Sequence, residues 1–313
     1  MTRVNVLLPA YEPKKEHICA AVESVLNQST TDFKLHIQDD CSKYEDTKNH
    51  ISKYLDNSRV SFKVNKKNLG IGPNWNKCLE FGDSQYIAYL FHDDIWDPKY
   101  LEKMSKVLDE NDDIGFVSAR HSYIKDDDYI DTSSYDGLKT FVKNNILSGH
   151  NNGRELLLWW AEKGLTPNII GEPSFVMFRR KLIEEVGPFH ETMPQFLDSE
   201  YSIRCLLKTN WYYLDEDLGS FRIHKAAASA QNEEKGLGKF DRFECFQMLI
   251  KKSKKEDKAK LKQSFQKAFD GMIKKYIKRR GKGKSVSTKG SGAFKKFLLR
   301  HPLFVFRTIF RNK

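Results

Sequence analysis

The sequence lacks any long apolar run. Its 313 residues contain no stretch that approaches the roughly 18 apolar residues of a membrane-spanning helix. The start, MTRVNVLLPAYEP, lacks the basic and then apolar stretch and the small-residue cleavage site of a secretory signal. We therefore expect the chain to stay in the cytosol, and we interpret its short apolar start as a buried strand.

Cysteine is scarce and unpatterned. The five cysteines, at positions 19, 41, 78, 205 and 245, include no C-x-x-C pair. This argues against a disulfide framework and against a zinc site, and reduced thiols suit a reducing compartment. Internal repeats are also missing from the sequence. In contrast, 39% of the residues are hydrophobic, which is enough for a packed core.

A net positive charge is missing from most of the chain and is found only at its end. The overall net charge is +11. Residues 251–313 hold 22 Lys and Arg against 3 Asp and Glu, whereas residues 1–250 have a net charge of −8. Such asymmetry indicates a basic segment that meets an anionic surface. No recognition fold for nucleic acid accompanies the lysines, so we expect a membrane surface and no nucleic acid.

The first half of the chain alternates strand and helix patterns. We predict strands at residues 4–9, 33–37, 60–64 and 86–90, and helices at 15–27, 45–55 and 75–81, with a turn cluster at 68–73. This βαβαβαβ order predicts an α/β fold with a mostly parallel sheet and right-handed crossovers.

The second half is less regular. Residues 121–170 have a loop-rich composition, and a strand at 175–179 is followed by helices at 180–186 and 198–208. We divide the chain into a catalytic domain (1–230), a helical extension (231–280), a flexible linker (281–293) and a basic amphipathic tail (294–313). Basic residues interleaved with aromatics are typical of a membrane-interface anchor, although the tail could instead pack on the protein or on a partner.

Polar residues follow three of the predicted strands. They are Pro9-Ala10-Tyr11 after the first strand, Asp39-Asp40 after the second and His92-Asp93-Asp94 after the fourth. Parallel α/β sheets bind ligands beyond the carboxyl ends of their strands. The sequence therefore predicts a ligand site at this edge of the sheet.

Each of these groups has two interpretations. Asp93 and Asp94 are costly side by side unless a cation is bound, and a Mg²⁺ or Mn²⁺ ion there would bridge a diphosphate. The alternative is a solvated turn whose aspartates cap the next helix. Asp39 and Asp40 either accept hydrogen bonds from a base or a sugar hydroxyl or cap a helix.

Two later segments are equally ambiguous when taken alone. Asp198 precedes a helix, where it is either a general base or an N-cap, with Arg204 on a solvated face in the second case. His224 follows a strand-like segment, where it either ligates a metal or a phosphate or is an ordinary core or surface histidine.

Eight segments in a fixed order resemble the motifs of one family. They are residues 4–11 (VNVLLPAY), 24–28 (SVLNQ), 38–42 (QDDCS), 68–70 (NLG) with 76–79 (NKCL), 86–98 (YIAYLFHDDIWDP), 175–180 (FVMFRR) with 186–189 (VGPF), 198–204 (DSEYSIR) and 222–224 (RIH). The ordered set covers about residues 3–230 and resembles glycosyltransferase family 2, inverting enzymes with the GT-A fold.

The resemblance implies a role for each matched position. It implies that Asp93 ligates Mn²⁺ or Mg²⁺, together with His224, and that Asp198 is the general base. It implies donor contacts from further residues, namely Pro9, Ala10, Tyr11, Asp39, Asp40, Asn68, Gly70, Asn76, His92, Asp93 and Arg204.

The resemblance also implies a function. A hexosyl or N-acetylhexosaminyl group would pass from a nucleotide diphosphate sugar, with uridine expected, to a glycan or lipid-linked glycan. The site would be cytoplasmic, on a protein held peripherally at the inner face of the membrane. A nucleotidyltransferase is a poorer interpretation, because residues 8–15 (LPAYEPKK) supply no Gly-rich phosphate loop.

One position departs from the family pattern. The first aspartate of the family's D-x-D signature falls on Phe91, and its middle position falls on His92. Only the last aspartate, Asp93, is kept. This favours an alternative in which the protein is a catalytically silent, membrane-associated scaffold or binder of nucleotide sugars.

Overall fold

The computed structural model describes residues 2–44, 46–126, 131–225, 227, 231–232, 237–238, 240–281, 299 and 302. The strands are β1 Thr2–Ala10, β2 Phe33–Asp39, β3 Val60–Val64, β4 Ser84–Tyr89, β5 Ile95–Trp96, β6 Ile114–Lys125, β7 Gly149–Asn151, β8 Val176–Arg179 and β9 Asn210–Ile223.

The α-helices are α1 Lys15–Leu26, α2 Thr47–His50, α3 Ile71–Cys78, α4 Tyr100–Glu110, α5 Ser133–Asn145, α6 Gly153–Glu162, α7 Arg180–Val186, α8 Leu197–Leu206, α10 Asp241–Lys252 and α11 Lys258–Gly281. Short 3₁₀ helices accompany them at η1 Ser52–Tyr54, η2 Pro173–Phe175 and η3 Lys255–Asp257.

The strands form one mixed sheet in the order β3-β2-β1-β4-β8-β6-β9-β5, and β7 pairs with β9. β1 to β4 are parallel, β8 is antiparallel to both β4 and β6, and β9 is parallel to β6. The α/β class is confirmed, but the prediction of a mostly parallel sheet is wrong beyond β4. β8 lies between β4 and β6 and is antiparallel to both, so β4 and β6 run in the same direction. Because β9 is parallel to β6, the strands β4, β6 and β9 all end at the same edge of the sheet.

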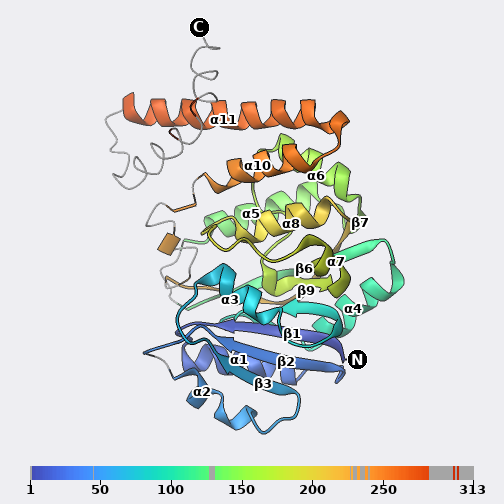
Figure 1. The fold of residues 1–313 in the computed structure, drawn as a ribbon, viewed down its shortest axis with the longest axis vertical. Coiled ribbons are helices and arrows are strands. Elements are labelled where there is room, and N and C mark those ends of the chain that lie inside the picture. Colours follow the sequence, from blue (N-terminus) through green and yellow to red (C-terminus); the bar gives the residue numbers. More distant parts are fainter. Residues whose placement is uncertain are drawn as a thin grey trace.

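Each face of the sheet has its own hydrophobic core. Along β1, Val4, Val6 and Leu8 enter the core beneath α1 and α4, whereas Leu7 enters the core beneath α6 and α8. This follows from the period of two along a strand. Figure 1 shows α1 and α2 on one side of the sheet and α6, α8, α10 and α11 stacked on the other. A strand buried on both sides is mostly apolar, and from Val4 to Ala10 β1 has one polar residue, the buried Asn5.

The predicted helical extension is present as α10 and α11. It does not form a separate core, because Phe243, Phe246, Phe265 and Phe269 lie in the same cluster as Trp160 of α6. Burial of each such ring stabilises the fold by about 1.5–3 kcal/mol. The helices therefore extend the layer on that face of the sheet, and the domain boundary at residue 230 stays a prediction.

The prediction of a loop-rich stretch at residues 121–170 is wrong. It holds the end of β6, then α5, β7 and α6. Asn152 caps α6 by accepting a hydrogen bond from the Glu155 backbone N–H, a capping signature that the sequence carries. At Gly153 a Cβ atom would lie 2.0 Å from the Thr209 carbonyl oxygen, so close packing against the α8–β9 turn explains the glycine.

Two predicted helices have different bounds. In place of the helix expected at 45–55, the described residues 46–55 contain the single turns α2 and η1. The helix expected at 75–81 begins at Ile71 and ends at Cys78, with Pro73 in its first turn, where proline costs no intrahelical hydrogen bond. Among the described residues, no helix is long and apolar enough to cross a membrane.

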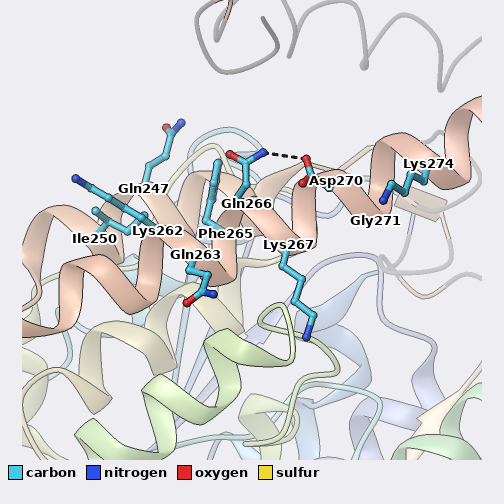
Figure 2. Close-up of a pocket in the computed structure, with 10 residues that line it drawn as sticks. All are labelled: Gln247, Ile250, Lys262, Gln263, Phe265, Gln266, Lys267, Asp270, Gly271 and Lys274. Atoms are coloured by element: carbon cyan, nitrogen blue, oxygen red, sulfur yellow. Dashed lines mark hydrogen bonds between the residues drawn. The ribbon is translucent and has the colours of Figure 1, made fainter. Parts of the chain in front are cut away.

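The predicted linker and tail lie outside the described residues, apart from Gly281, which ends α11, and positions 299 and 302. A surface hollow between α10 and α11 is lined by Gln247, Ile250, Lys262, Gln263, Phe265, Gln266, Lys267, Asp270, Gly271 and Lys274 (Figure 2). None of the predicted site residues belongs to it, so the hollow is separate from the strand ends where we sought the site.

Candidate active site

The loops after β1 and β2 are joined to each other at the carboxyl edge of the sheet. The Asp40 backbone N–H donates to the Ala10 carbonyl (2.8 Å), and the Glu12 N–H donates to Ser42 Oγ (2.8 Å). Pro9 and Ala10 are buried within β1. Tyr11, by contrast, is 46% exposed directly after the strand. Of the first predicted donor segment, Tyr11 alone presents its side chain to solvent.

Asp39 and Asp40 are both buried and both organise loops. Asp39 accepts hydrogen bonds from Ser42 Oγ (2.6 Å) and N (2.8 Å) and from Thr47 Oγ1 (2.7 Å). Asp40 accepts from Asn65 Nδ2 (2.8 Å) and from the Leu69 and Gly70 backbone N–H groups (2.8 and 2.9 Å). The carboxylates therefore hold the β1, β2 and β3 loops together, and their contact with a nucleoside stays a prediction.

The loop that Asp40 holds carries the next predicted residues. Gly70 has φ +88°, a conformation that favours glycine, and Asn68 beside it is exposed. The side-chain amide of Asn76, in α3, makes two hydrogen bonds to the Phe189 backbone. It donates to the carbonyl (3.0 Å) and accepts from the N–H (2.7 Å). The geometry supports a packing role for Asn76.

The Arg204 side chain is buried and hydrogen-bonded within the protein. Its guanidinium makes a double hydrogen bond to the Glu200 carboxylate (2.8 and 2.9 Å) and also donates to the Val186 and Pro188 carbonyls (2.9 Å each). It is 9% exposed. The solvated-face interpretation is therefore wrong. The donor contact expected of Arg204 is untested, but these partners explain the residue without it.

Asp93 and His224, the predicted metal ligands, lie together. Asp93 follows β4 and His224 follows β9, and His224 Nε2 is 2.8 Å from Asp93 Oδ2. Between them, Arg222 donates from Nε to the Asp93 carbonyl (2.9 Å) and from its backbone N–H to Asp94 Oδ1 (2.9 Å). These bonds join the ends of β4 and β9.

Electrostatics favour a charged Asp93 beside a neutral Asp94. Burial opposes ionisation of Asp93, but His92 and the hydrogen bond to His224 outweigh it, so the pKa of Asp93 lies below its ordinary value. Burial, and then the charge of Asp93, raise the pKa of Asp94 well above its ordinary value. One carboxylate of the pair thus carries the negative charge.

The residues present fit a divalent cation held by few protein ligands. No group of three or more His, Cys, Asp or Glu side chains suits a metal within the part of the chain that the structure describes. Mg²⁺ and related ions often take only one or two carboxylates and complete their shell with water and phosphate. His224 Nδ1 and Asp94 Oδ2 are buried and lack hydrogen-bond partners among the described residues. Asp93 and His224 are therefore suited to such an ion.

A second network of polar contacts lies beside the Asp93–His224 pair, and we did not predict it from the sequence. Asp126, directly after β6, accepts from Arg222 (2.8 Å), and His17 Nε2 lies 2.9 Å from its other oxygen. The His17 and His224 ring centroids are 5.8 Å apart. Asp126 stands in the stretch that we interpreted as loop-rich, and only the extension of β6 to Lys125 brings it to this edge.

The departure at Phe91 has a packing explanation. The Phe91 ring stacks on Trp75 of α3 (4.8 Å between centroids), and its backbone N–H donates to Ser174 Oγ (3.0 Å). His92 next to it is half-buried. An apolar side chain at this position therefore belongs to the contact between α3 and the end of β4.

Asp198 is the second residue of α8, and Phe196 is the N-cap, with no side-chain capping bond. The N-cap interpretation is therefore wrong. Asp198 Oδ2 accepts from Asn168 Nδ2 (2.8 Å), and Oδ1 accepts from the Ser199 N–H (2.6 Å). Burial raises the pKa of Asp198 to about 6. Such a carboxylate is ionised at neutral pH and close to the value that suits a general base.

Curated proteins of other organisms are similar to this chain in sequence. An uncharacterized glycosyltransferase, MJ1057, of Methanocaldococcus jannaschii is 27% identical over 70% of this chain and 70% of its own length. The Escherichia coli protein WfgD, a "UDP-Glc:alpha-D-GlcNAc-diphosphoundecaprenol beta-1,3-glucosyltransferase", is 28% identical over 41% of this chain and 49% of its own length.

Solved structures share the fold. The Staphylococcus aureus protein TarS (residues 1–349), crystallised with UDP-GlcNAc, superposes with a TM-score of 0.64 over 86% of this chain and 72% of its own, at 14% identity. The mannosyltransferase PcManGT from Pyrobaculum calidifontis, in complex with GDP-Man and Mn²⁺, gives 0.59 over 98% and 83%, at 14% identity. The GT-A fold predicted from the sequence is thereby confirmed.

The sequence profile of "Glycosyl transferase family 2" matches residues 5–187. This span contains most of β1, all of β2 to β4 and the segment around Asp93. It covers more than half of the 313 residues, so the chain belongs to glycosyl transferase family 2.

Proposed function

We propose that this glycosyltransferase moves a hexosyl or N-acetylhexosaminyl group from a uridine diphosphate sugar to an acceptor hydroxyl, with inversion at the anomeric carbon. One observation carries the proposal: the Asp93–His224 pair at the carboxyl edge of the sheet, with a separate carboxylate, Asp198, whose pKa is raised to about 6. The Asp93–His224 pair suits the diphosphate end of a donor, and the Asp198 carboxylate suits a general base.

The proposed chemistry is a single displacement. Asp198 accepts the proton of the acceptor hydroxyl while the oxygen of that hydroxyl bonds to the anomeric carbon. The bond from the anomeric carbon to the diphosphate breaks on the opposite side. The electron pair leaves with the nucleoside diphosphate. Asn168 and the Ser199 N–H hold the Asp198 carboxylate in one orientation during this step. A bound Mn²⁺ or Mg²⁺, held by Asp93 and His224, would neutralise charge on the departing diphosphate.

The nucleoside end is proposed to lie over the joined β1 and β2 loops. Tyr11 is the exposed ring there, and Asp39 and Asp40 set the shape of the loops. Uridine is favoured by the UDP-GlcNAc bound to TarS and the UDP-Glc in the name of WfgD. The GDP-Man and Mn²⁺ bound to PcManGT support a nucleotide sugar and a divalent ion more generally.

The acceptor is proposed to be a glycan or a lipid-linked glycan at the cytoplasmic face of a membrane. The diphosphoundecaprenol acceptor in the name of WfgD supports a lipid-linked sugar. The basic segment 251–313 supports a peripheral protein at an anionic surface, where each basic residue contributes about 1 kcal/mol.

The test is a thermal-shift screen of UDP-glucose, UDP-galactose, UDP-GlcNAc and UDP-GalNAc with and without MnCl₂. At a donor concentration of 100 times the dissociation constant, binding stabilises the fold by about 2.7 kcal/mol. We expect one donor to stabilise the protein in a manganese-dependent way, and Asp198→Asn to retain this shift while losing transfer. Absence of any shift from a folded protein would contradict the proposal.

The second candidate is a silent binder or scaffold, which the Phe91–Trp75 stack favours because no carboxylate occupies the first signature position. It predicts donor binding without turnover. Equal, background-level release of UDP by the native protein and by Asp198→Asn, with donor binding intact, would support it.

A further inference from the structure

Arg222 joins the ends of β4, β6 and β9. From its place in β9, its backbone N–H donates to Asp94 Oδ1 (2.9 Å) and its Nε donates to the Asp93 carbonyl (2.9 Å), both beyond β4. Its Nη1 donates to Asp126 Oδ1 (2.8 Å), directly after β6. The Arg222 and Asp126 side chains are each 12% exposed. The guanidinium is therefore a largely buried charge, and Asp126 supplies the carboxylate that pairs with it.

Both carboxylate oxygens of Asp126 have partners. Oδ1 accepts from Arg222, whereas Oδ2 lies 2.9 Å from His17 Nε2 and 3.4 Å from Lys14 Nζ. Burial opposes ionisation of Asp126, but the hydrogen bond from Arg222 and the charge of His17 outweigh it, so the pKa of Asp126 lies below its ordinary value. An ionised carboxylate with partners on both oxygens fixes the position of the guanidinium beside it.

The Arg222 guanidinium also touches the residue proposed to bind a cation. Its Nε is bonded to the main chain of Asp93, so the Asp93 carboxylate belongs to a residue that the guanidinium already contacts. A largely buried charge that loses its partner is strongly disfavoured, and it turns toward the next anion within reach. Without Asp126, that anion would be the Asp93 carboxylate, and an arginine paired with it would compete with a divalent cation.

His17 extends the same arrangement to the other member of the pair. Its side chain is 6% exposed, and its ring lies 5.8 Å from the His224 ring, with the two planes tilted by 57°. Asp126 thus holds one group that contacts Asp93 and one group that packs beside His224. Partners that orient metal ligands in this way contribute to metal affinity without touching the metal.

We propose that Asp126 is a positioning residue that holds the Arg222 guanidinium away from the Asp93 carboxylate, and thereby keeps that carboxylate available to the divalent cation of the donor diphosphate. The inference rests on the proposed function, because it takes Asp93 as a cation ligand. It goes beyond that function by giving a role to a carboxylate that acts only through its neighbours.

The alternative is that Asp126 merely ties β6 to β9 and to the start of α1. The two roles predict opposite effects of a second substitution. If Arg222 competes for Asp93, removing Arg222 as well should undo the effect of removing Asp126. If Asp126 is only a structural tie, removing Arg222 as well should make matters worse. A double-mutant cycle measures this coupling directly.

The test measures Mn²⁺ binding to the full chain in the presence of UDP, by calorimetry and by the electron paramagnetic resonance signal of unbound Mn²⁺. The variants are Asp126→Asn, Arg222→Gln and the double variant, each shown to be folded by circular dichroism. Asp217→Asn is the matched control, because Asp217 Oδ2 lies 3.3 Å from Arg120 Nη2 in an ion pair that also joins β6 to β9 but is about half exposed.

We expect Asp126→Asn to bind Mn²⁺ about tenfold more weakly or worse, the usual loss when a partner of a metal ligand is removed. Arg222→Gln should bind Mn²⁺ at least as tightly as the native protein, and the double variant should regain the affinity that Asp126→Asn loses. Asp217→Asn should stay within about twofold of the native protein, as for a distant site.

Four results would count against the inference. Native affinity in folded Asp126→Asn would remove the positioning role. Equal weakness of Asp126→Asn and the double variant would leave Asp126 as a structural tie. Should Asp126→Asn fail to fold, Arg222→Gln decides alone, because weaker Mn²⁺ binding by that variant would contradict a competing guanidinium. Failure of the native protein to bind Mn²⁺ with UDP would instead contradict the proposed function, and the inference would fall with it.

Discussion

Asp93 Oδ2 and His224 Nε2 lie 2.8 Å apart although 131 positions separate them in the chain. The contact exists because β4 and β9 end at the same edge of the sheet, and the Arg222 bonds to Asp93 and Asp94 hold the two ends in register. Two of the predicted functional residues are thereby brought together. The metal role expected of them stays a prediction that the following experiment tests.

Replacing His224 by asparagine should weaken Mn²⁺ binding in the presence of UDP by about 10- to 100-fold, because a ligand to a charged centre is lost. Calorimetric titration with MnCl₂ measures the change. The matched control is His150→Asn, since His150 Nε2 lies 2.7 Å from Asp113 Oδ2 in a similar but exposed pair. An equal loss in both variants would contradict a specific role for His224.

Asp198→Asn should lower kcat by about 10²- to 10⁴-fold, the usual contribution of a general base. The variant keeps the side-chain shape and an oxygen that can accept from Asn168, so KM for the donor should change little. Steady-state release of UDP measures both constants. A variant with more than half of the native kcat would exclude Asp198 as the base.

Transfer should depend on pH with a midpoint near the Asp198 pKa of about 6. The base acts in its ionised form, so the rate should be full above this pH and fall as the pH drops through it. A profile of kcat/KM between pH 5 and 8 measures the acid limb, whose pKa belongs to the free enzyme. An acid limb that persists unchanged in the residual activity of Asp198→Asn would assign it to another group.

The Asp198 carboxylate should also lower the free energy of unfolding at neutral pH. Its folded pKa of about 6 lies above the ordinary 3.8, so the folded state binds the proton more tightly than the unfolded chain. Its contribution to the free energy of unfolding is fully present below about pH 4 and is lost as pH rises through about 6. Asp198→Asn should therefore melt no lower than the native protein at pH 7.5. A markedly lower Tm would show that the charge itself supports the fold.

Asp40→Asn should destabilise the fold by about 1–3 kcal/mol, because an amide would turn donor hydrogens toward N–H groups that now point at a carboxylate. The affected partners are Asn65, Leu69 and Gly70. Thermal unfolding measures the loss. Exposed Asp56 provides the control, and similar stabilities of Asp40→Asn and Asp56→Asn would contradict the scaffolding role.

Gly72→Ala should destabilise the fold by about 1–3 kcal/mol through overpacking. A Cβ atom at Gly72 would lie 2.5 Å from the His190 carbonyl oxygen, whereas nothing lies within 4 Å of one built at Gly82. Gly82→Ala is thus the matched control, and denaturant unfolding compares the two. Equal stabilities would mean that the 189–191 segment moves aside without cost.

Sequence patterns predicted the strands and the first helix of the first hundred residues well, but not the bounds of the next two helices. β1 to β4 and α1 stand where apolar periodicity placed them, because those residues are buried by local strands and one amphipathic helix. The stretch 121–170 was predicted wrongly, although Asn152 and Glu155 carry a capping signal for α6. No side chain of α5 is fully buried, and only a few, such as Phe141 and Val142, pack against the core, so its apolar pattern is weak.

The sequence by itself determined the fold class and the family resemblance, and that resemblance marked Asp93, His224 and Asp198 as candidates, because its motifs are short and local in the chain. Only the tertiary structure decided what surrounds them. Asn168 and Asp126 reach the site through the mixed sheet, and Arg204 and Asn76 are occupied by backbone groups far from them in the chain. Hydrogen-bond partners depend on strand order and loop packing, which residue periodicity does not encode.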